Sequence, residues 1–232
     1  MCRRPIPNLI LNLSMVVACW LSPPPTAGQG AEVAAKAVVE GHVTLQEGRE
    51  RQRPPRYYRG PYRSTRDTVT ADSPLLHVVV FLENVPPPSG GWAATPTQEM
   101  AQRHDTFIPH VLPILAGTAV EFPNRDDYYH NVFSVVSGDR FDLGRYGEGV
   151  AELQTFVHPA VVVVRCEIHA GMKAYIVVRD NPYFTTVGED GRYQLQIPAG
   201  THRLVGWHPT RGRVERLIQV RAGDSLQVDL SL

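Results

Sequence analysis

The stretch VVVVRCEIHAGMKAYIVV, from Val161 to Val178, places a short polar link between two runs of β-branched and apolar residues. Such runs are typical of buried strands, and the short link between them predicts a strand-to-strand loop. Cys166, His169 and Met172 lie in this link at intervals of three. Side chains of the types that bind soft and intermediate metal ions are therefore gathered in one predicted loop.

The composition of the 232-residue chain favours a β protein that is rich in turns. It contains 20 prolines and 19 glycines, which disfavour long helices. The apolar fraction of 43% is ordinary for a globular protein, and the length allows one large domain or two small ones. Because the formal net charge is zero, no overall field favours nucleic acid as a partner.

The first 30 residues have the features of a secretory signal peptide. Arg3 and Arg4 form a basic start, an apolar run follows from Leu9 to Leu21, and PPPTAGQGA then supplies a helix break and small residues. The apolar run is shorter than the roughly 20 residues of a membrane span. We therefore expect cleavage near Gly28 to Ala31 and a periplasmic or secreted mature chain.

The sequence VVAC, which ends at Cys19, leaves a second outcome for the N-terminus. It resembles a bacterial lipobox, and lipidation of Cys19 would anchor the protein in the cell envelope. In either case Cys2 and Cys19 are lost or modified, so Cys166 is the free thiol of the mature chain. Exported proteins normally pair their cysteines, so an unpaired one needs a reason: a metal bond, a nucleophile, an intermolecular disulfide or a buried inert thiol.

Short apolar segments at near-regular spacing predict an all-β sandwich architecture. The first two predicted strands, in AKAVVEGHVTLQEG and LLHVVVFLENVP, are separated by residues 49–66, which contain seven arginines among prolines and tyrosines. We interpret 49–66 as a solvated loop, with docking to an acidic partner or an anionic surface as the alternative. After residue 180 the sequence alternates with period two between turns at Asp190-Gly191, Ala199-Gly200 and Ala222-Gly223.

The middle of the chain supplies the strands around the cysteine loop. FIPHVLPILAGTAVEFPN predicts two strands around a turn at Gly117, and HNVFSVV predicts a strand that begins at His130. GDRFDLGRYGEG is predicted to be a loop because of its repeated glycines. LQTFVHPAVVVVRC predicts a strand, a corner at Pro159 and a long buried strand, and KAYIVV predicts the last one.

The residue types in the loop indicate a particular metal chemistry. One Cys, two His and a weak Met form the ligand set of a mononuclear blue-copper site. The short loop can wrap Cys166, His169 and Met172 around one ion. The second histidine must come from elsewhere, and His130 is the candidate.

The segment from Gln98 to Arg179 resembles the cupredoxins. FIPHVLPILAGTAVEFPNRDDYYHNVFS is similar to their strand, glycine turn, Phe-x-Asn strand and first His ligand, and CEIHAGM has the Cys-x-x-His-x-x-Met spacing of amicyanin. The resemblance implies a Greek-key β-sandwich and one type 1 copper. The ligands that it implies are His130, Cys166, His169 and Met172.

The resemblance implies a supporting role for Asn131, which would join the two ligand loops by hydrogen bonding. It also implies that His169 lies near a surface patch where a redox partner docks. The family's loops usually carry a proline near the histidine, whereas this loop has Glu167, Ala170 and Gly171. This difference leaves the reduction potential open.

Roles for Cys166 that do not involve copper fit less of the sequence. A buried inert cysteine would account for neither His169 nor Met172, and a structural zinc site rarely recruits Met. A binuclear copper centre would need a second cysteine in the loop. A Cys-His hydrolase would need an orienting acid or amide and an oxyanion hole. His110 and His158, which lie beside prolines, are expected to be structural or exposed.

The flanking segments resemble a second family. TTVGEDGRYQLQIPAGTHRLVGWHP is similar to the carboxypeptidase regulatory-like, transthyretin-like β-sandwich, whose first strands resemble VVEGHVTL and HVVVFLENVP. We therefore predict a discontinuous sandwich made of residues 36–95 and 181–232, with a cupredoxin domain at 96–180 between them. Two sequential modules are the alternative.

The predicted function follows from the implied copper site. Four protein ligands would leave no open position for a substrate, so we expect an electron-transfer copper protein rather than an enzyme. The whole arrangement is also similar to bacterial exported proteins described as methylamine-utilisation or plastocyanin-like. Its partners would be redox proteins, such as a cytochrome or a dehydrogenase. The alternatives are a non-redox copper carrier and a cell-envelope binding module that uses the transthyretin-like sandwich.

Overall fold

The computed structural model describes residues 36–46, 73–93, 95–135 and 140–232. The predictions for the signal peptide at 1–30, for Cys2 and Cys19 and for the arginine-containing loop at 49–66 lie outside these residues. The described chain is all-β, as predicted: eighteen strands are joined by turns, and the helical element is one 3-10 turn, η1 (Pro74–His77). Among the described residues no helix has the length and apolar character that a membrane crossing requires.

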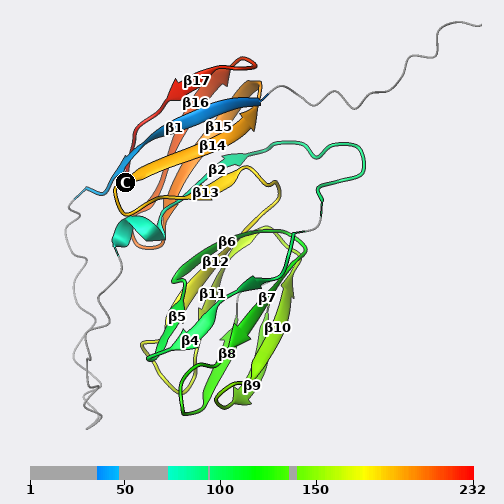
Figure 1. Cartoon of the computed structure of the whole chain (residues 1–232), viewed down its shortest axis with the longest axis vertical. Coiled ribbons are helices and arrows are strands. Elements are labelled where there is room, and N and C mark those ends of the chain that lie inside the picture. The colour runs from blue at the N-terminus through cyan, green and yellow to red at the C-terminus, as the bar shows by residue number, and fades with distance from the viewer. Residues whose placement is uncertain (1–35, 47–72, 94, 136–139) are drawn as a thin grey trace, which may run out of the picture. The chain divides into compact units, whose positions relative to one another are not determined.

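Strands from both ends of the described chain share two sheets, which we call the flanking sandwich (Figure 1). One sheet has the order β14-β1-β17, with β18 also paired to β1, and the other has the order β13-β2-β15-β16. The strands are β1 (Lys36–Thr44), β2 (Val79–Glu83), β13 (Phe184–Thr186), β14 (Arg192–Pro198), β15 (Gly200–His208), β16 (Gly212–Val220), β17 (Ser225–Gln227) and β18 (Leu230–Ser231).

Alternation of side chains builds the core of the flanking sandwich. In β1 the side chains of Ala37, Val39 and Val43 are buried, and β14 alternates in the same way through Tyr193, Leu195 and Ile197. Because successive side chains of a strand point to opposite faces, each sheet presents one apolar face to the other. The predicted period-two pattern after residue 180 is confirmed.

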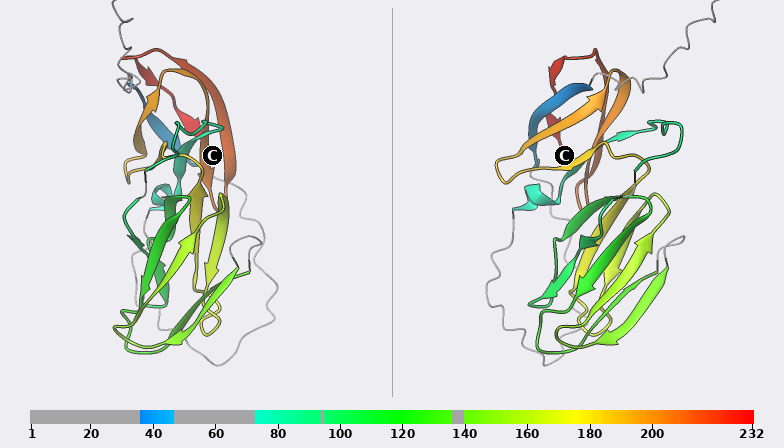
Figure 2. Two further views of the ribbon diagram at one scale, coloured as in Figure 1. Left: turned by 90° about the vertical axis from the view of Figure 1, so that its right-hand side faces the viewer. Right: turned by 45° about the vertical axis from the view of Figure 1, so that its right-hand side comes forward.

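The middle of the chain forms two further sheets, which we call the central sandwich (Figure 2). A five-stranded sheet has the order β6-β12-β11-β8-β9, a three-stranded sheet has the order β10-β7-β3, and β4 and β5 form a hairpin. The strands are β3 (Gln98–Glu99), β4 (Ala101–Arg103), β5 (Thr106–Ile108), β6 (Val111–Leu115), β7 (Thr118–Pro123), β8 (His130–Ser134), β9 (Phe141–Tyr146), β10 (Ala151–Phe156), β11 (Ala160–Arg165) and β12 (Lys173–Arg179).

Two strands are apolar on both faces because each lies between two cores. Val80 and Leu82 of β2 face the core of the flanking sandwich, whereas Phe81 belongs to a third cluster. Tyr175 and Val177 of β12 join that third cluster, while the alternate residues of β12 enter the core of the central sandwich. Burial on both faces explains why HVVVFL and KAYIVV are continuous apolar runs rather than alternating ones.

Two sequence-based predictions in the central sandwich are wrong. The segment GDRFDLGRYGEG is not a loop, because Phe141–Tyr146 form β9, which pairs with β8 across a register shift between Asn131 and Phe133. Gly144, at φ +73°, accommodates the irregularity, so this glycine marks a bent strand rather than a loop. The strand β11 is not fully buried either, since its side chains alternate and Val161 is exposed.

Candidate metal centre

A tight hairpin loop holds the cysteine, the second histidine and the methionine. β11 and β12 pair up to Arg165 and Lys173, and the seven residues between them close the hairpin. The Cys166 amide donates to the Met172 carbonyl at 3.2 Å, and the Met172 amide donates to the His169 carbonyl at 2.9 Å. These backbone bonds fold the loop back on itself, so its side chains are presented from a fixed frame.

The first histidine reaches the same place from the neighbouring strand. His130 is the first residue of β8, which pairs with β11, and its side chain is completely buried. Its Nδ1 lies 3.9 Å from Cys166 Sγ and 3.0 Å from His169 Nδ1, and His169 Nδ1 lies 3.8 Å from the sulfur. The structure thus brings three of the four predicted ligands together, with one donor atom of each within 4.8 Å of the others.

Met172, the fourth predicted ligand, ends the same loop and is buried. It belongs to the hydrophobic cluster of the central sandwich that also contains Cys166. The thioether of Met172 is therefore shielded from water. Its role as the axial ligand remains a prediction.

Asn131 connects the two segments that carry the ligands. Its Oδ1 accepts a hydrogen bond from the Glu167 amide at 3.0 Å, and its Nδ2 donates to Asp142 Oδ1 at 2.8 Å. The side chain therefore joins the start of β8 to the cysteine loop and to β9. This is the kind of contact that the resemblance implied for Asn131.

The surroundings of Cys166 favour the thiolate. Burial alone would raise the pKa of this thiol, but hydrogen bonds from His130 and from the amides of Asn131, His169 and Ile168 outweigh it and lower the pKa to about 6. The sulfur can therefore bind a metal as the charged thiolate near neutral pH. The thiol is the free cysteine of the described residues.

A carboxylate lies directly behind His130. Asp126 Oδ2 is 2.8 Å from His130 Nε2, and both side chains are buried. Burial alone would raise the pKa of Asp126, but bonds from the His104 amide, the His130 ring and the Asp105 amide lower it. For His130, burial would lower the pKa, and the bonds to Cys166 and Asp126 outweigh burial and raise it.

His169 lies nearer the surface than His130. Its side chain is 19% exposed, and its Nε2 is 3.6 Å from Oδ1 of Asp105, whose own side chain is 44% exposed. Tyr128 donates to the same Asp105 oxygen at 2.9 Å, and its ring centroid is 5.6 Å from that of His169. Tyr128 and Ile168, which directly precedes His169, are both exposed, so large apolar side chains lie at this edge of the site.

Sequence reasoning did not find Asp126, Asp105 or Tyr128. The spacing of Asp126, four residues before His130 in PNRDDYYHN, was a visible signal for a carboxylate close to the ligand. Asp105 gave no such signal, because it comes from the β4–β5 turn and meets the site only in the folded chain.

Cys166, His130 and Asp126 are connected in the order of a nucleophile, a base and an orienting acid. A hydrolase with this triad would have to admit a substrate carbonyl to the sulfur. The Cys166 residue is only 4% exposed and His130 is not exposed at all. Burial therefore argues against covalent catalysis at this thiol.

The two histidines that were expected to be structural or exposed, His110 and His158, are not part of the Cys166 cluster. The His110 ring is packed 4.5 Å from that of His77 and 5.6 Å from that of Tyr175, which fits the structural role expected for it. His158 is exposed, as predicted. Among the described residues, the groups of side chains with the arrangement of a metal site are the Cys166 cluster and a second set, Asp105, Asp126 and His130, that shares a histidine with it.

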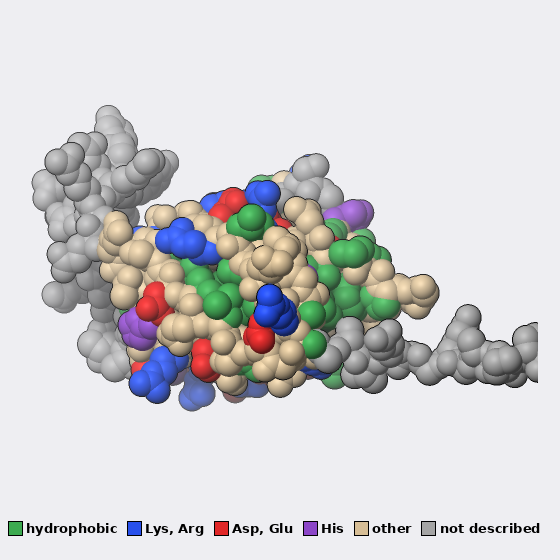
Figure 3. All heavy atoms as spheres, turned by 90° about the horizontal axis from the view of Figure 1, so that it is seen from above, with side chains coloured by type: hydrophobic (Ala, Val, Ile, Leu, Met, Phe, Trp, Pro, Cys, Tyr) green, Lys and Arg blue, Asp and Glu red, His purple; other side chains and the backbone are tan. Residues whose placement is uncertain are grey.

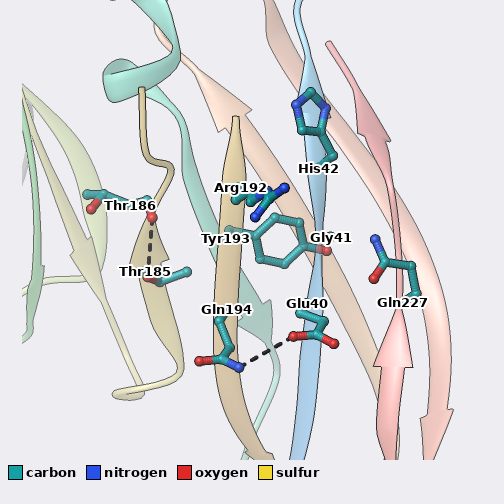
Figure 4. Close-up of a pocket in the computed structure, with 9 residues that line it drawn as sticks. All are labelled: Glu40, Gly41, His42, Thr185, Thr186, Arg192, Tyr193, Gln194 and Gln227. Carbon is teal, nitrogen blue, oxygen red and sulfur yellow. Dashed lines mark hydrogen bonds between the residues drawn. The ribbon is translucent and has the colours of Figure 1, made fainter. Parts of the chain in front are cut away.

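A hollow of about 770 Å³ lies in the flanking sandwich, away from the cysteine (Figure 4). Polar side chains of β1, β13, β14 and β17 line it, and two of them have these contacts: Gln194 Nε2 donates to Glu40 Oε2 at 3.4 Å, and His42 Nε2 is 2.9 Å from the Asp190 carbonyl oxygen. We assign this hollow no role. On the face of the molecule shown in Figure 3, basic and acidic side chains are interspersed rather than gathered by sign.

Similar solved structures include copper proteins. A Cu-containing nitrite reductase from Thermus scotoductus SA-01 is 28% identical, with 39% of this chain and 24% of the reductase aligned at a TM-score of 0.36. A purple cupredoxin from Nitrosopumilus maritimus is 19% identical, with 35% of this chain and 99% of that chain aligned at 0.33. A reduced amicyanin variant is 19% identical, with 43% and 98% aligned at 0.34.

No protein-family model matches the sequence, and no curated protein matches it either. The chain spans about a quarter of the length of the nitrite reductase. At TM-scores this low, the similarity to these structures carries no functional conclusion for this chain.

Proposed function

We propose that this chain is an exported type 1 copper protein that carries single electrons between redox partners. One observation carries the proposal: the Cys166 thiol and the imidazole nitrogens of His130 and His169 lie within 4.8 Å of one another, with Cys166 and His130 buried and His169 partly buried. Thiolate and imidazole are the ligands that copper prefers, and Met172 in the same loop would complete a blue-copper set. The low pKa of Cys166 supports the fit, because a metal-bound cysteine must be deprotonated.

When bound, copper would supply a one-electron couple, and the protein would keep the ligands in fixed positions. The two backbone bonds of the loop and the Asn131 tie resist rearrangement of Cys166 and His169. Burial of His130, Cys166 and Met172 excludes water from the donor atoms. A rigid, dry ligand set would let electrons be exchanged with little reorganisation.

Four protein ligands would leave no open position for a substrate, which favours a carrier over an enzyme. The partly exposed edge of His169 is the proposed point of electron entry and exit. Ile168, which directly precedes His169, and Tyr128, whose ring centroid is 5.6 Å from that of His169, are exposed and largely apolar, which suits brief contact with a redox protein such as a cytochrome or a dehydrogenase.

Loading of the mature chain, from about Ala31 onward, with one equivalent of copper(II) tests this proposal. We expect an intense visible thiolate-to-copper band and an EPR spectrum with narrow hyperfine splitting, both of them abolished in Cys166→Ser. A colourless protein, or a pale tetragonal copper spectrum that survives Cys166→Ser, would contradict it.

The same sample distinguishes an electron carrier from a non-redox copper carrier. An electron carrier should be reduced and reoxidised repeatedly with one copper per chain throughout. Release of copper on reduction would instead favour the copper carrier. The measurement is the copper-to-protein ratio after each redox cycle, with the free metal removed by gel filtration.

We also propose that the flanking sandwich is a carboxypeptidase regulatory-like, transthyretin-like module with a role in stability or interaction. The pairing of β1 with β14, β17 and β18 supports this, because it joins the predicted first strand to the tail.

Export is tested by mass spectrometry of the mature N-terminus. Cleavage near Gly28 to Ala31 would indicate a periplasmic or secreted protein, and a lipidated Cys19 a protein anchored in the cell envelope.

A further inference from the structure

The two histidines of the cluster have different environments at the nitrogens that face away from the sulfur. His130 Nε2 is 2.8 Å from a buried carboxylate oxygen of Asp126. His169 Nε2 is 3.6 Å from Asp105, a longer contact than a hydrogen bond, and that carboxylate is half-exposed. Only His130 therefore has a short, water-shielded bond to an anion.

Asp126 is held in place by contacts on both sides. Its Oδ1 accepts the His104 amide at 2.7 Å and its Oδ2 accepts the Asp105 amide at 3.3 Å, and these two residues form the left-handed turn between β4 and β5. Its own amide donates to Asn124 Oδ1 at 3.0 Å.

Asn124 in turn fixes the loop that leads to His130. Its Nδ2 donates to the carbonyl oxygens of Tyr128 and Tyr146, at 2.8 and 3.1 Å. Tyr146 is the strand partner of His130 across β8 and β9. The carboxylate therefore belongs to a network that links the turn, the loop and the strand, and its position does not depend on the histidine alone.

We infer that Asp126 is a positioning residue that locks the His130 ring, with Nε2 as donor and Nδ1 free to bind the metal, and that its charge favours the oxidised over the reduced copper ion. This inference rests on the proposed function. The fixed tautomer follows from the bond, because a carboxylate accepts hydrogen bonds and an imidazole nitrogen that donates to it must carry the proton.

The effect on the metal follows from charge and basicity. A carboxylate bonded to the far nitrogen raises the basicity of a ligating imidazole. A buried negative charge is also poorly screened and stabilises the more highly charged copper(II) more than copper(I). Asp126 should therefore lower the reduction potential, whereas the longer, more exposed contact of Asp105 with His169 should have a smaller effect.

The test is to compare Asp126→Asn and Asp127→Asn in the copper-loaded mature chain. Asparagine keeps an oxygen that can accept from His130 but removes the charge, and Asp127 is the exposed neighbour that controls for loss of one charge in the same loop. We expect Asp126→Asn to weaken copper(II) binding by about 10- to 100-fold, the usual cost of mutating such a partner. If copper(I) affinity is unchanged, each factor of ten raises the potential by about 59 mV.

Equal shifts in the two variants, or no shift in Asp126→Asn, would overturn the inference while leaving a blue wild-type protein and the proposed function intact. A wild-type protein without the blue spectrum would refute the proposed function itself. A second equivalent of tightly bound copper at Asp105 and Asp126 would also overturn the inference, because the carboxylates would then be ligands.

A measurement on the wild type needs no substitution and covers the case in which Asp126→Asn does not fold. Pulsed EPR of the copper(II) protein detects the remote nitrogen of each coordinated imidazole. We expect two different remote nitrogens, one of them strongly hydrogen-bonded. Two identical remote nitrogens with no strong hydrogen bond would overturn the role of Asp126.

Discussion

The Glu167 amide donates a hydrogen bond of 3.0 Å to Oδ1 of Asn131, and this bond spans the two segments that carry the candidate ligands. Glu167 follows Cys166 directly, and Asn131 follows His130 directly. The Asn131 side chain, together with the pairing of β8 with β11, therefore holds near one another a sulfur and an imidazole that are far apart in the sequence.

Replacement of Asn131 by Ala should loosen this arrangement and weaken copper binding. The loss of an outer hydrogen-bonding partner of a metal site typically costs about 10- to 100-fold in affinity, and we expect a loss in that range. Competition with a copper chelator measures it. Glu167→Ala is the matched control, because it keeps the donating amide and removes only an exposed ion pair with Arg145, which contributes little. Equal losses in the two variants would contradict the role of Asn131.

Met172→Leu should keep the copper and raise the reduction potential. Leucine has a volume similar to that of methionine, so the buried position should tolerate it at a cost below about 1.5 kcal/mol. Removal of a weak sulfur donor leaves the metal with less electron density, which favours the reduced ion. Voltammetry on the variant measures the potential. Loss of copper from Met172→Leu would show that the axial assignment is wrong.

The ligand loop was predictable from the sequence because its geometry is local. Cys166, His169 and Met172 lie within one hairpin, so their spacing indicated candidate ligands, and His130 was added because it begins a strand and matches the cupredoxin pattern. Metal binding by these four residues stays a prediction. The all-β class was predictable for a related reason, since turn residues and alternation are also local features.

The parts that sequence reasoning missed depend on contacts between distant segments. The bond of Asp126 to the His104 amide joins the 124–130 loop to the β4–β5 turn, and no pattern within either segment indicates it. The strand β9 was missed because Gly144 resembles a loop signal, whereas pairing with β8 keeps the segment extended. Val161 was predicted to be buried because a continuous apolar run does not reveal which faces of the strand are covered.

Gly41 in β1 should not tolerate a side chain. A Cβ atom there would overlap the Val228 carbonyl oxygen. That carbonyl cannot move away freely, because the Tyr193 hydroxyl donates to it at 2.6 Å and the Val228 amide donates to the Glu40 carbonyl at 2.8 Å. Gly41→Ala should therefore lower the free energy of unfolding by about 1–3 kcal/mol, the usual cost of overpacking.

Urea unfolding of the metal-free chain measures this loss. Gly171→Ala is the control, because a Cβ there meets no atom within 4 Å. A Gly41→Ala variant as stable as Gly171→Ala would mean that β1 and the tail can separate without cost.

His208 should make folding stability depend on pH between about 4 and 6.5. Burial lowers its pKa to about 4, with further lowering by His77, Arg211 and His110 and an opposing effect of the Pro74 backbone. Between the folded value and the ordinary value near 6.5, the unfolded chain binds a proton at this position that the folded chain does not. Its contribution to stability is therefore complete above about pH 6.5 and is lost as the pH falls, by about 2 kcal/mol between pH 7 and pH 5.

The variant His208→Asn isolates this contribution. The His208 Nδ1 accepts the amides of Thr210 and Arg211, both at 3.2 Å, and an asparagine oxygen can take over that role without titrating. Urea unfolding at pH 7 and pH 5 should show a smaller loss of stability in His208→Asn than in the wild type, because only the wild type gains a proton here on unfolding. The same loss in both proteins would mean that other groups cause the acid sensitivity and that His208 is protonated equally in the folded and unfolded chains.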